Sequence, residues 1–156
     1  MKILYICTHN RCRSILSEAV TNHLSNGAII AKSAGSQPVG EVHPLSLKYL
    51  AEAGISTAGL VSESWDSCAD FAPDLVVTVC DSAAGETCPL WMGQTLKVHW
   101  GLADPSKLSG SEDDIAAAFR ATINEIRQRV NALMAIDFST LDQASLSSAL
   151  ARLGVQ

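Results

Sequence analysis

Short apolar runs alternate with amphipathic stretches along the whole chain. Four of the runs are brief, rich in β-branched residues and bounded by polar or turn-forming residues, so they predict buried strands. Between and after these runs, apolar residues recur at the spacing of a helix, which predicts helices there. The predicted strands span residues 2–7, 28–33, 74–80 and 96–100, and the predicted helices span residues 14–25, 44–53, 65–71, 111–136 and 140–153. Such alternation is typical of an α/β domain with a parallel sheet.

The predicted helices carry the residue types that start a helix. Ser14 and Ser111 are predicted N-caps, and Pro44 stands at the first position of its helix. We expect a doubly wound sheet of four parallel strands in the order 2-1-3-4, flanked by helices. Residues 1–138 are expected to form this single domain, and residues 139–156 a helical tail that packs on it or extends from it.

The amino-acid composition disfavours some classes of function. The chain has 156 residues, of which 47% are hydrophobic and 17% charged, so a single domain buries its core without a metal or a disulfide. The formal net charge of −5 and the 5% aromatic content disfavour a general nucleic-acid binder. No apolar stretch reaches the ~20 residues of a membrane span, and the N-terminus does not read as a signal peptide, so we expect a cytoplasmic location. In that reducing compartment the five cysteines are expected to be catalytic, redox-active or metal-binding.

Three chemically capable residues follow predicted strands. Cys7 ends the first strand, Cys80 ends the third, and Asp104 lies four residues past the fourth. Ligands of doubly wound sheets bind beyond the carboxyl ends of the strands. We therefore expect all three side chains at one edge of the sheet.

The segment from Cys7 to Ser14 is a Cys-x5-Arg-Ser run between a strand and a helix. Backbone amides in such a loop, together with the positive end of the helix, favour an oxyanion such as phosphate, arsenate or sulfate. Arg13 can bind two of its oxygens, and the same field is expected to lower the pKa of Cys7 and favour its thiolate. The alternative to this anion-binding site is that Cys7 is only a small buried hydrophobic residue at the end of a strand. The candidate oxyanion-binding residues are Thr8, His9, Asn10, Arg11, Cys12, Arg13 and Ser14.

Cys80 and Cys88 bracket a small loop that contains glycine and alanine, and they are predicted to form a redox pair. Unrelated buried thiols and a zinc site are the alternatives. Zinc sites favour two to four residues between cysteines, which this pair does not match. The zinc ligands in that alternative would be Cys68, Cys80, Cys88 and His99.

Asp104 precedes Pro105 in a loop after the fourth predicted strand. A carboxyl group that faces an oxyanion site can donate a proton to a leaving oxygen. The alternative is an ordinary Asp-Pro turn. Its place at the edge shared with Cys7 and Cys80 favours the proton donor.

Together, these segments resemble a known family. The run CTHNRCRS, followed by a loop with an acidic residue, resembles the low-molecular-weight protein-tyrosine phosphatase fold. The segments CDSAAGETCP and HWGLADPS resemble the arsenate reductases that are built on that fold. The resemblance covers about residues 1–136.

The resemblance implies a reaction and a role for each thiol. Arsenate is held by the loop amides and Arg13 while the Cys7 thiolate attacks arsenic and Asp104 protonates the departing oxygen. Cys80 then attacks Cys7 and releases arsenite, and Cys88 attacks Cys80, which moves the disulfide to Cys80–Cys88. A thioredoxin-type partner reduces that bond, with no tightly bound cofactor. Related folds draw electrons from glutaredoxin or a low-molecular-weight thiol instead.

The resemblance also assigns supporting roles. Asn10 matches the asparagine that organises the loop, and Ser14 the hydroxyl that stabilises the thiolate. Some relatives hold a potassium ion near the loop, for which Asn10, Glu18 and Ser33 are the candidates. The eight-residue step from Cys80 to Cys88 is one residue longer than in some members.

Two other functions share part of this pattern. A phosphotyrosine protein phosphatase does not need Cys80 and Cys88, and its acidic loop often carries tyrosines, which this chain lacks near Asp104. A redox-sensing or anion-binding protein would keep the loop but would not need Asp104 as a proton donor. The sequence therefore favours arsenate reduction for arsenic detoxification over both.

Overall fold

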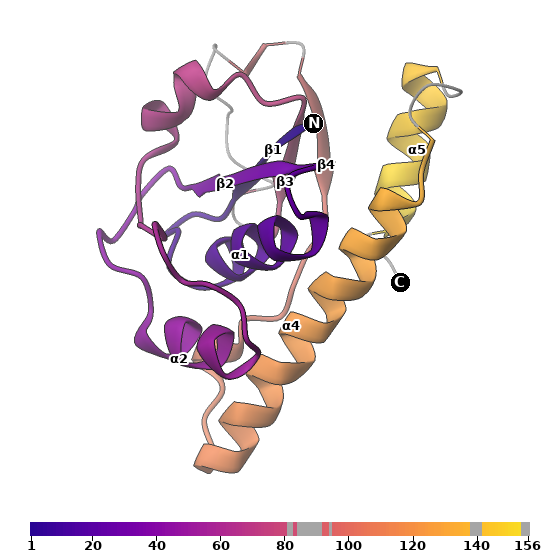
Figure 1. The fold of residues 1–156 in the computed structure, drawn as a ribbon. Helices are drawn as coiled ribbons and strands as arrows, with labels where there is room; N and C mark the ends of the chain where they lie inside the picture. The colour runs from indigo at the N-terminus through magenta and orange to yellow at the C-terminus, as the bar shows by residue number, and fades with distance from the viewer. Residues whose placement is uncertain (81–82, 84–91, 94, 138–141, 154–156) are drawn as a thin grey trace.

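The computed structural model describes residues 1–80, 83, 92–93, 95–137 and 142–153. Its four strands form one parallel sheet in the order β2-β1-β3-β4, which confirms the predicted topology (Figure 1). The strands are β1 (Lys2–Ile6), β2 (Ile30–Ala34), β3 (Leu75–Thr78) and β4 (Leu96–His99). The second strand begins two residues later than predicted because Ala28 closes a turn, its amide donating to the Ser25 carbonyl at 3.0 Å.

The central strand β1 is apolar because both faces of the sheet are covered. Residues Ile3 to Ile6 are all at most 1% exposed. One face packs against α1 (Arg13–Ser25) and α4 (Glu112–Met134), with α2 (Pro44–Glu52) beside them; the short 3₁₀ helix η1 (Trp65–Phe71) lies on the other side of the sheet (Figure 1). A strand covered on both faces reads as a continuous hydrophobic run, as the sequence of β1 does.

The helices begin where capping chemistry allows, with one correction. Ser111 and Asp114 form a reciprocal capping box at the start of α4, as predicted for Ser111. Ser14, by contrast, is not an N-cap: α1 begins at Arg13, and the residue before it makes no side-chain capping bond. The Ser14 hydroxyl is instead buried and accepts a hydrogen bond from Asn10 Nδ2 at 2.8 Å.

The C-terminal helix α5 (Gln143–Leu153) packs against β4 and α4. Leu150 is fully buried, and its carbonyl accepts a 2.7 Å hydrogen bond from the indole nitrogen of Trp100. Within the described ranges, no helix is both long and apolar enough to cross a membrane.

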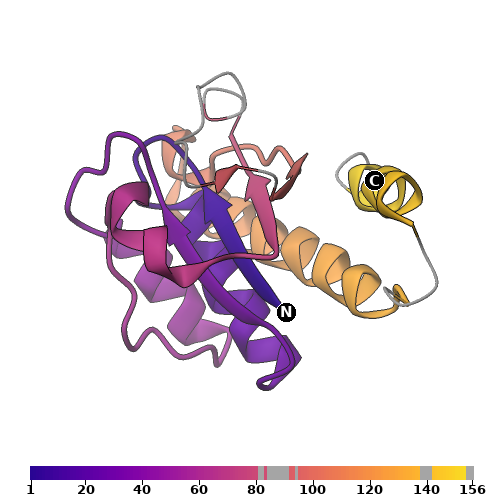
Figure 2. The same ribbon diagram turned by 90° about the horizontal axis from the view of Figure 1, so that it is seen from above.

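The carboxyl ends of the strands bring the candidate residues together. All three strand pairs are parallel, so the segments that follow β1, β3 and β4 leave the sheet at the same edge (Figure 2). After β4 the chain reaches Asp104, which caps the short 3₁₀ helix η3 (Pro105–Lys107). The fold therefore places Cys7, Cys80 and Asp104 at one end of the sheet.

Candidate active site

The loop of residues 7–14 is held by Asn10, which is fully buried and has a left-handed backbone with φ of 46°. Asparagine tolerates this conformation better than most residues. Its side-chain nitrogen donates to Ser14 Oγ at 2.8 Å and to Ser33 Oγ at 3.0 Å, and its oxygen accepts from the Glu63 amide at 2.8 Å. Asn10 thus ties the loop to Ser33 of β2 and to the backbone at Glu63.

Gly35 lets the chain after β2 approach this loop. A Cβ atom at that position would collide with the carbonyl oxygens of Cys7 and Thr8. The Cys7 amide also donates to the Ala34 carbonyl at 3.2 Å. Only glycine allows so close an approach, and the path of residues 7–14 depends on it.

A small pocket of about 40 Å³ opens at this edge of the sheet. The lining contains four basic side chains and one carboxylate, in a chain whose net charge is −5. Its described residues include no tyrosine, tryptophan or phenylalanine. This local excess of positive charge suits a small oxyanion. The lining residues are Cys7, His9, Arg11, Cys12, Arg13, Asp104 and Lys107.

Arg13 and Asp104 face each other across the pocket. Arg13 Nη2 lies 3.5 Å from Asp104 Oδ2, and Nη1 donates to the Leu102 carbonyl at 3.2 Å. The Nε of Arg13 is buried and has no partner among the described residues. Asp104 Oδ1 accepts from the amide and the hydroxyl of Ser106, at 2.9 and 2.6 Å, which leaves Oδ2 on the side of Arg13. An oxyanion in the pocket would therefore meet a guanidinium donor and a carboxyl group together.

The side chains of Cys7 and Cys80 are hydrogen-bonded to each other. Two backbone amides also donate to Cys80 Sγ, those of Thr8 and Ala83, each at 3.4 Å. The Thr8 hydroxyl lies 3.7 Å from the same sulfur. The structure thus brings the first two thiols of the predicted relay into contact, although 72 residues separate Thr8 from Cys80.

The hydrogen bond between the two thiols moves their pKa values in opposite directions. The hydrogen bond with Cys7 and the amides of Thr8 and Ala83 together lower the pKa of Cys80 to about 5, against the opposing effect of burial. The same bond raises the pKa of Cys7, as does burial, while Arg13 opposes the rise. The predicted lowering of the Cys7 pKa is therefore wrong in this geometry, because the hydrogen bond with Cys80 and burial outweigh the effect of Arg13. Transfer of one proton from Cys7 to Cys80 moves the charge to Cys7.

The remaining cysteines have other partners than this pair or lie outside the described residues. Cys12 lines the pocket but is buried, and burial raises its pKa to about 11. Cys68 packs in the core beside Glu63, its Sγ 3.8 Å from the carboxylate. Cys88 lies outside the described residues.

The described residues do not bring the zinc ligands of the alternative interpretation together. Cys68 and Cys80 have separate surroundings, and His99 Nδ1 is hydrogen-bonded to Thr78 Oγ1 at 2.8 Å. Across the described ranges no three His, Cys, Asp or Glu side chains are grouped to hold a metal.

The three potassium candidates form a chain of hydrogen bonds in which Asn10 and Ser33 are buried and Glu18 is partly exposed. Asn10 donates to Ser33, whose hydroxyl donates to Glu18 Oε1 at 2.6 Å. Burial and, to a smaller extent, the charge of Glu63 raise the pKa of Glu18 to about 7, although the hydrogen bond from Ser33 opposes the rise. Carboxylate and hydroxyl oxygens suit a hard cation, whereas the Asn10 oxygen is already occupied by the Glu63 amide.

Sequence reasoning missed Lys107, which lines the pocket from the end of η3. It also missed Glu63, whose amide binds Asn10 and whose charge acts on Glu18. The three-residue step from Asp104 to Lys107 was an available signal, because one turn of a 3₁₀ helix places such residues on the same side. Glu63 stands in a segment without regular pattern, and nothing in the sequence connects it to the loop.

Comparisons with known proteins agree with this geometry. The model of the low molecular weight phosphotyrosine protein phosphatase family matches residues 2–146. The arsenate reductase of Halalkalibacterium halodurans is 34% identical over 82% of this chain and 91% of its own length. The glutaredoxin arsenate reductase of Synechocystis sp. is 28% identical over 86% of this chain and 96% of its own.

Solved structures show the same likeness. A structure described as an arsenate reductase in the phosphate-binding state has a TM-score of 0.70 and 29% identity, over 86% of this chain and 96% of that one. The Corynebacterium glutamicum thioredoxin-dependent arsenate reductase has a TM-score of 0.65 and 27% identity, over 85% of this chain and 59% of that one.

Proposed function

The chain belongs to the low molecular weight phosphotyrosine protein phosphatase family, and on that premise we propose that it reduces arsenate to arsenite with its own thiols. The contact between Cys7 and Cys80 carries the proposal. A phosphatase needs one thiol at the anion loop, whereas reduction of arsenic needs a second thiol to take up the oxidation. The alternative reading, a phosphotyrosine protein phosphatase, leaves Cys80 without a role.

The proposed first step is attack of Cys7 on arsenic. Cys7 gives its proton to Cys80 and forms a sulfur–arsenic bond while an arsenic–oxygen bond breaks. Arg13 holds the oxyanion together with the loop amides, and Asp104 supplies the proton that lets the oxygen leave as water. Thr8, His9, Arg11 and Cys12 complete the loop around the anion, with Asn10 and Ser14 holding its shape.

The second step makes a disulfide and releases arsenite. Cys80 releases its proton to solvent and attacks Cys7 Sγ; the sulfur–sulfur bond forms as the sulfur–arsenic bond breaks, and the electron pair of the broken bond reduces As(V) to As(III). Cys88 then attacks Cys80 and frees Cys7 as a thiolate, which leaves a Cys80–Cys88 disulfide. The reaction uses residues within 1–138, and residues 139–156 are proposed to serve as a supporting tail.

The proposed reductant of that disulfide is a thioredoxin-type protein in the cytoplasm. One solved relative is thioredoxin-dependent and one curated relative is a glutaredoxin arsenate reductase, so relatives of this chain differ in their reductant. Thioredoxin fits the three-thiol relay, because a disulfide between two protein cysteines is the substrate of a dithiol reductant. A two-cysteine route would instead need glutaredoxin or a low-molecular-weight thiol.

Arsenate-dependent oxidation of NADPH, with thioredoxin and its reductase supplied, tests the function. We expect oxidation that requires all three components and yields arsenite in equal amount. A second arm replaces thioredoxin with glutaredoxin and glutathione, and a third follows hydrolysis of an aryl phosphate. Hydrolysis without arsenate reduction would establish the phosphatase instead.

Asp104→Asn is expected to slow the first step by roughly 10²–10⁴-fold, the range of general acid catalysis, and to leave oxyanion affinity nearly unchanged. The asparagine keeps an acceptor for Ser106 but has no proton to give. Rapid-quench measurement of the first arsenite released gives the rate, and calorimetric titration with phosphate gives the affinity. Lost affinity with an unchanged rate would make Asp104 a binding residue.

Glu18 is expected to make stability fall as pH rises. Below about pH 4.5 its carboxyl is protonated in both states; between there and about pH 7 the unfolded chain ionises while the folded chain keeps the proton. The free energy of unfolding, relative to Glu18→Gln, should therefore fall by on the order of 3 kcal/mol across that range and stay constant above it. Urea unfolding of both proteins across this range measures the difference.

We propose that potassium binds at Glu18 and Ser33, which adds a second arm to this measurement. A cation favours the ionised carboxylate, so KCl should reduce the stability loss of the wild-type protein relative to choline chloride at equal ionic strength. Glu18→Gln is the control and should not distinguish the two salts. Equal responses of both proteins would contradict potassium binding there.

A further inference from the structure

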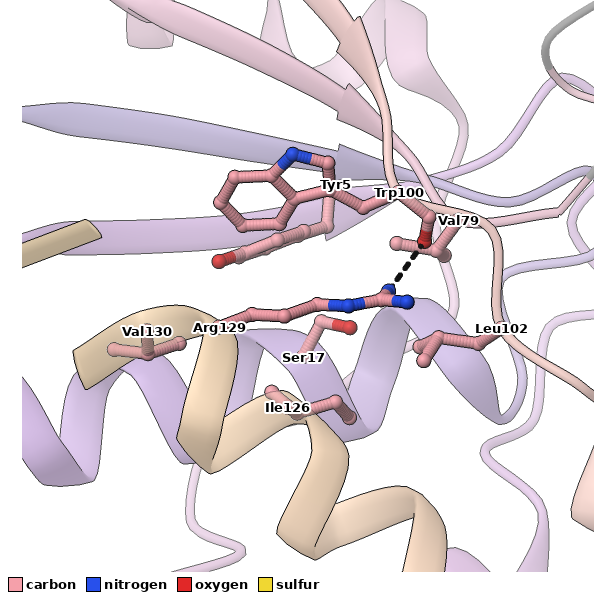
Figure 3. Close-up of a pocket in the computed structure, with 8 residues that line it drawn as sticks. All are labelled: Tyr5, Ser17, Val79, Trp100, Leu102, Ile126, Arg129 and Val130. Carbon is pink, nitrogen blue, oxygen red and sulfur yellow. Dashed lines mark hydrogen bonds between the residues drawn. The ribbon is translucent and has the colours of Figure 1, made fainter. Parts of the chain in front are cut away.

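Arg129 is a buried cation outside the anion pocket. It lies on α4 and is 5% exposed. Its side chain runs beneath the rings of Tyr5 and Trp100 and over Ser17 of α1, around a cavity of about 10 Å³ (Figure 3). A charge is seldom buried in a core unless its hydrogen bonds are met.

The contacts of Arg129 are directed at the segment that leads to Asp104. Nη1 donates to the Trp100 carbonyl at 3.0 Å, as the dashed line in Figure 3 shows, and Nη2 donates to the Gly101 carbonyl at 3.2 Å. Nη2 also contacts Glu125 Oε1, one helical turn away, at 2.8 Å. The guanidinium therefore binds two consecutive carbonyls of residues 100–104, which we call the acid loop.

The acid loop is bound on its other sides as well. Its amides at Trp100 and Leu102 donate to the carbonyls of Thr78 and Val79, at 2.8 and 2.9 Å. The Leu102 carbonyl accepts from Arg13 at 3.2 Å. Two arginines, one from the anion loop and one from α4, thus bind three successive carbonyls just before Asp104.

The same loop is tied to the C-terminal helix by Trp100. Its indole nitrogen donates to the Leu150 carbonyl at 2.7 Å. The backbone carbonyl and the ring of Trp100 are therefore bound by different helices, α4 and α5.

We propose that Arg129 is a positioning residue that holds the acid loop so that the carboxyl of Asp104 reaches the departing oxygen; this rests on the proposed arsenate reduction. Asp104 stands only three residues beyond Gly101, so the direction in which the chain leaves β4 sets where its carboxyl lies. The planar fork of an arginine holds two carbonyls at once, which a lysine ammonium cannot do with the same geometry.

Arg129→Lys tests the proposal, with Arg120→Lys as the matched control. Arg120 is on the same helix but exposed, and it pairs with Glu52 away from the acid loop. We expect Arg129→Lys to lower the single-turnover rate of arsenite release by about 10- to 100-fold, as displacement of a reacting group does, while phosphate affinity changes less than about twofold. Arg120→Lys should change neither.

Hydrogen exchange separates positioning from a general loss of structure and does not depend on the reaction. We expect faster amide exchange in residues 100–108 of Arg129→Lys, with exchange in β1 and α1 unchanged. If Arg129→Lys does not fold, Glu125→Gln, which removes one partner of the guanidinium, should give the same pattern with a smaller change.

The outcomes are distinct. A slowed reaction with local exchange confined to the acid loop supports the proposal. Unchanged exchange in residues 100–108, or exchange raised equally throughout the sheet, overturns it. If the wild-type protein releases no arsenite, the proposed function fails, and the exchange pattern still decides whether Arg129 holds the loop.

Discussion

Cys7→Ser is expected to abolish arsenate reduction. Serine has nearly the same shape, so the loop that Asn10 and Gly35 support should persist. A serine hydroxyl, however, does not ionise in this field, attacks arsenic poorly and cannot form the disulfide that carries the electrons. Quantifying arsenite over many hours at high enzyme concentration should show no more than the uncatalysed background.

Cys12→Ser and Cys68→Ser are the matched controls for this result. Each removes a buried thiol of the same chemistry, one from the pocket and one from the core beside Glu63. Both variants should keep most of the wild-type turnover. Substantial activity in Cys7→Ser, or its loss in folded Cys12→Ser, would mean that the attacking thiol is a different one.

Cys88→Ser is expected to release about one arsenite per enzyme and then stop, because Cys7 and Cys80 suffice for one reduction. The Cys7–Cys80 disulfide that remains would lie at the buried contact between these thiols, where a protein reductant has poor access. Mass spectrometry of the stalled protein should find Cys7 linked to Cys80. Pre-steady-state kinetics should show a burst of normal rate followed by almost no turnover.

Cys80→Ser gives the opposite pattern and serves as the control. It lacks the thiol that attacks Cys7, so neither a burst nor a disulfide is expected. Sustained turnover of Cys88→Ser with thioredoxin would remove Cys88 from the mechanism. Sustained turnover with glutathione alone would favour a two-cysteine route.

The topology and the position of the site were predictable because local patterns determine them. The apolar runs of β1 and β3 identify buried strands, and the parallel arrangement then brings Cys7 and Cys80 to one edge. The charge state of that pair was not predictable in the same way. It depends on which sulfur the amides of Thr8 and Ala83 reach, a geometric detail that neither segment contains by itself.

Two further features could not be predicted from the sequence, for related reasons. The Ser14 hydroxyl suits an N-cap by residue type, but a tertiary hydrogen bond from Asn10 occupies it. Arg129 sits in an amphipathic helix where arginines usually face solvent, and only its tertiary contacts with the carbonyls of Trp100 and Gly101 turn it inward. The preference of a residue type for a cap or an exposed position predicts its place only when no residue distant in the sequence binds its side chain more strongly.

The packing of α5 beside β4 covers a side of the sheet that has no neighbouring strand. β4 ends the strand order, so one side of its backbone has no partner strand, and such edges pair readily with other chains. The helix lies along this side of the sheet, with Leu150 and Leu153 buried (Figure 1). A chain cut before α5 would expose both that edge and the apolar surface of Trp100. The last helix thus covers an edge that could otherwise pair with another chain, a role separate from the chemistry at the other end of the strands.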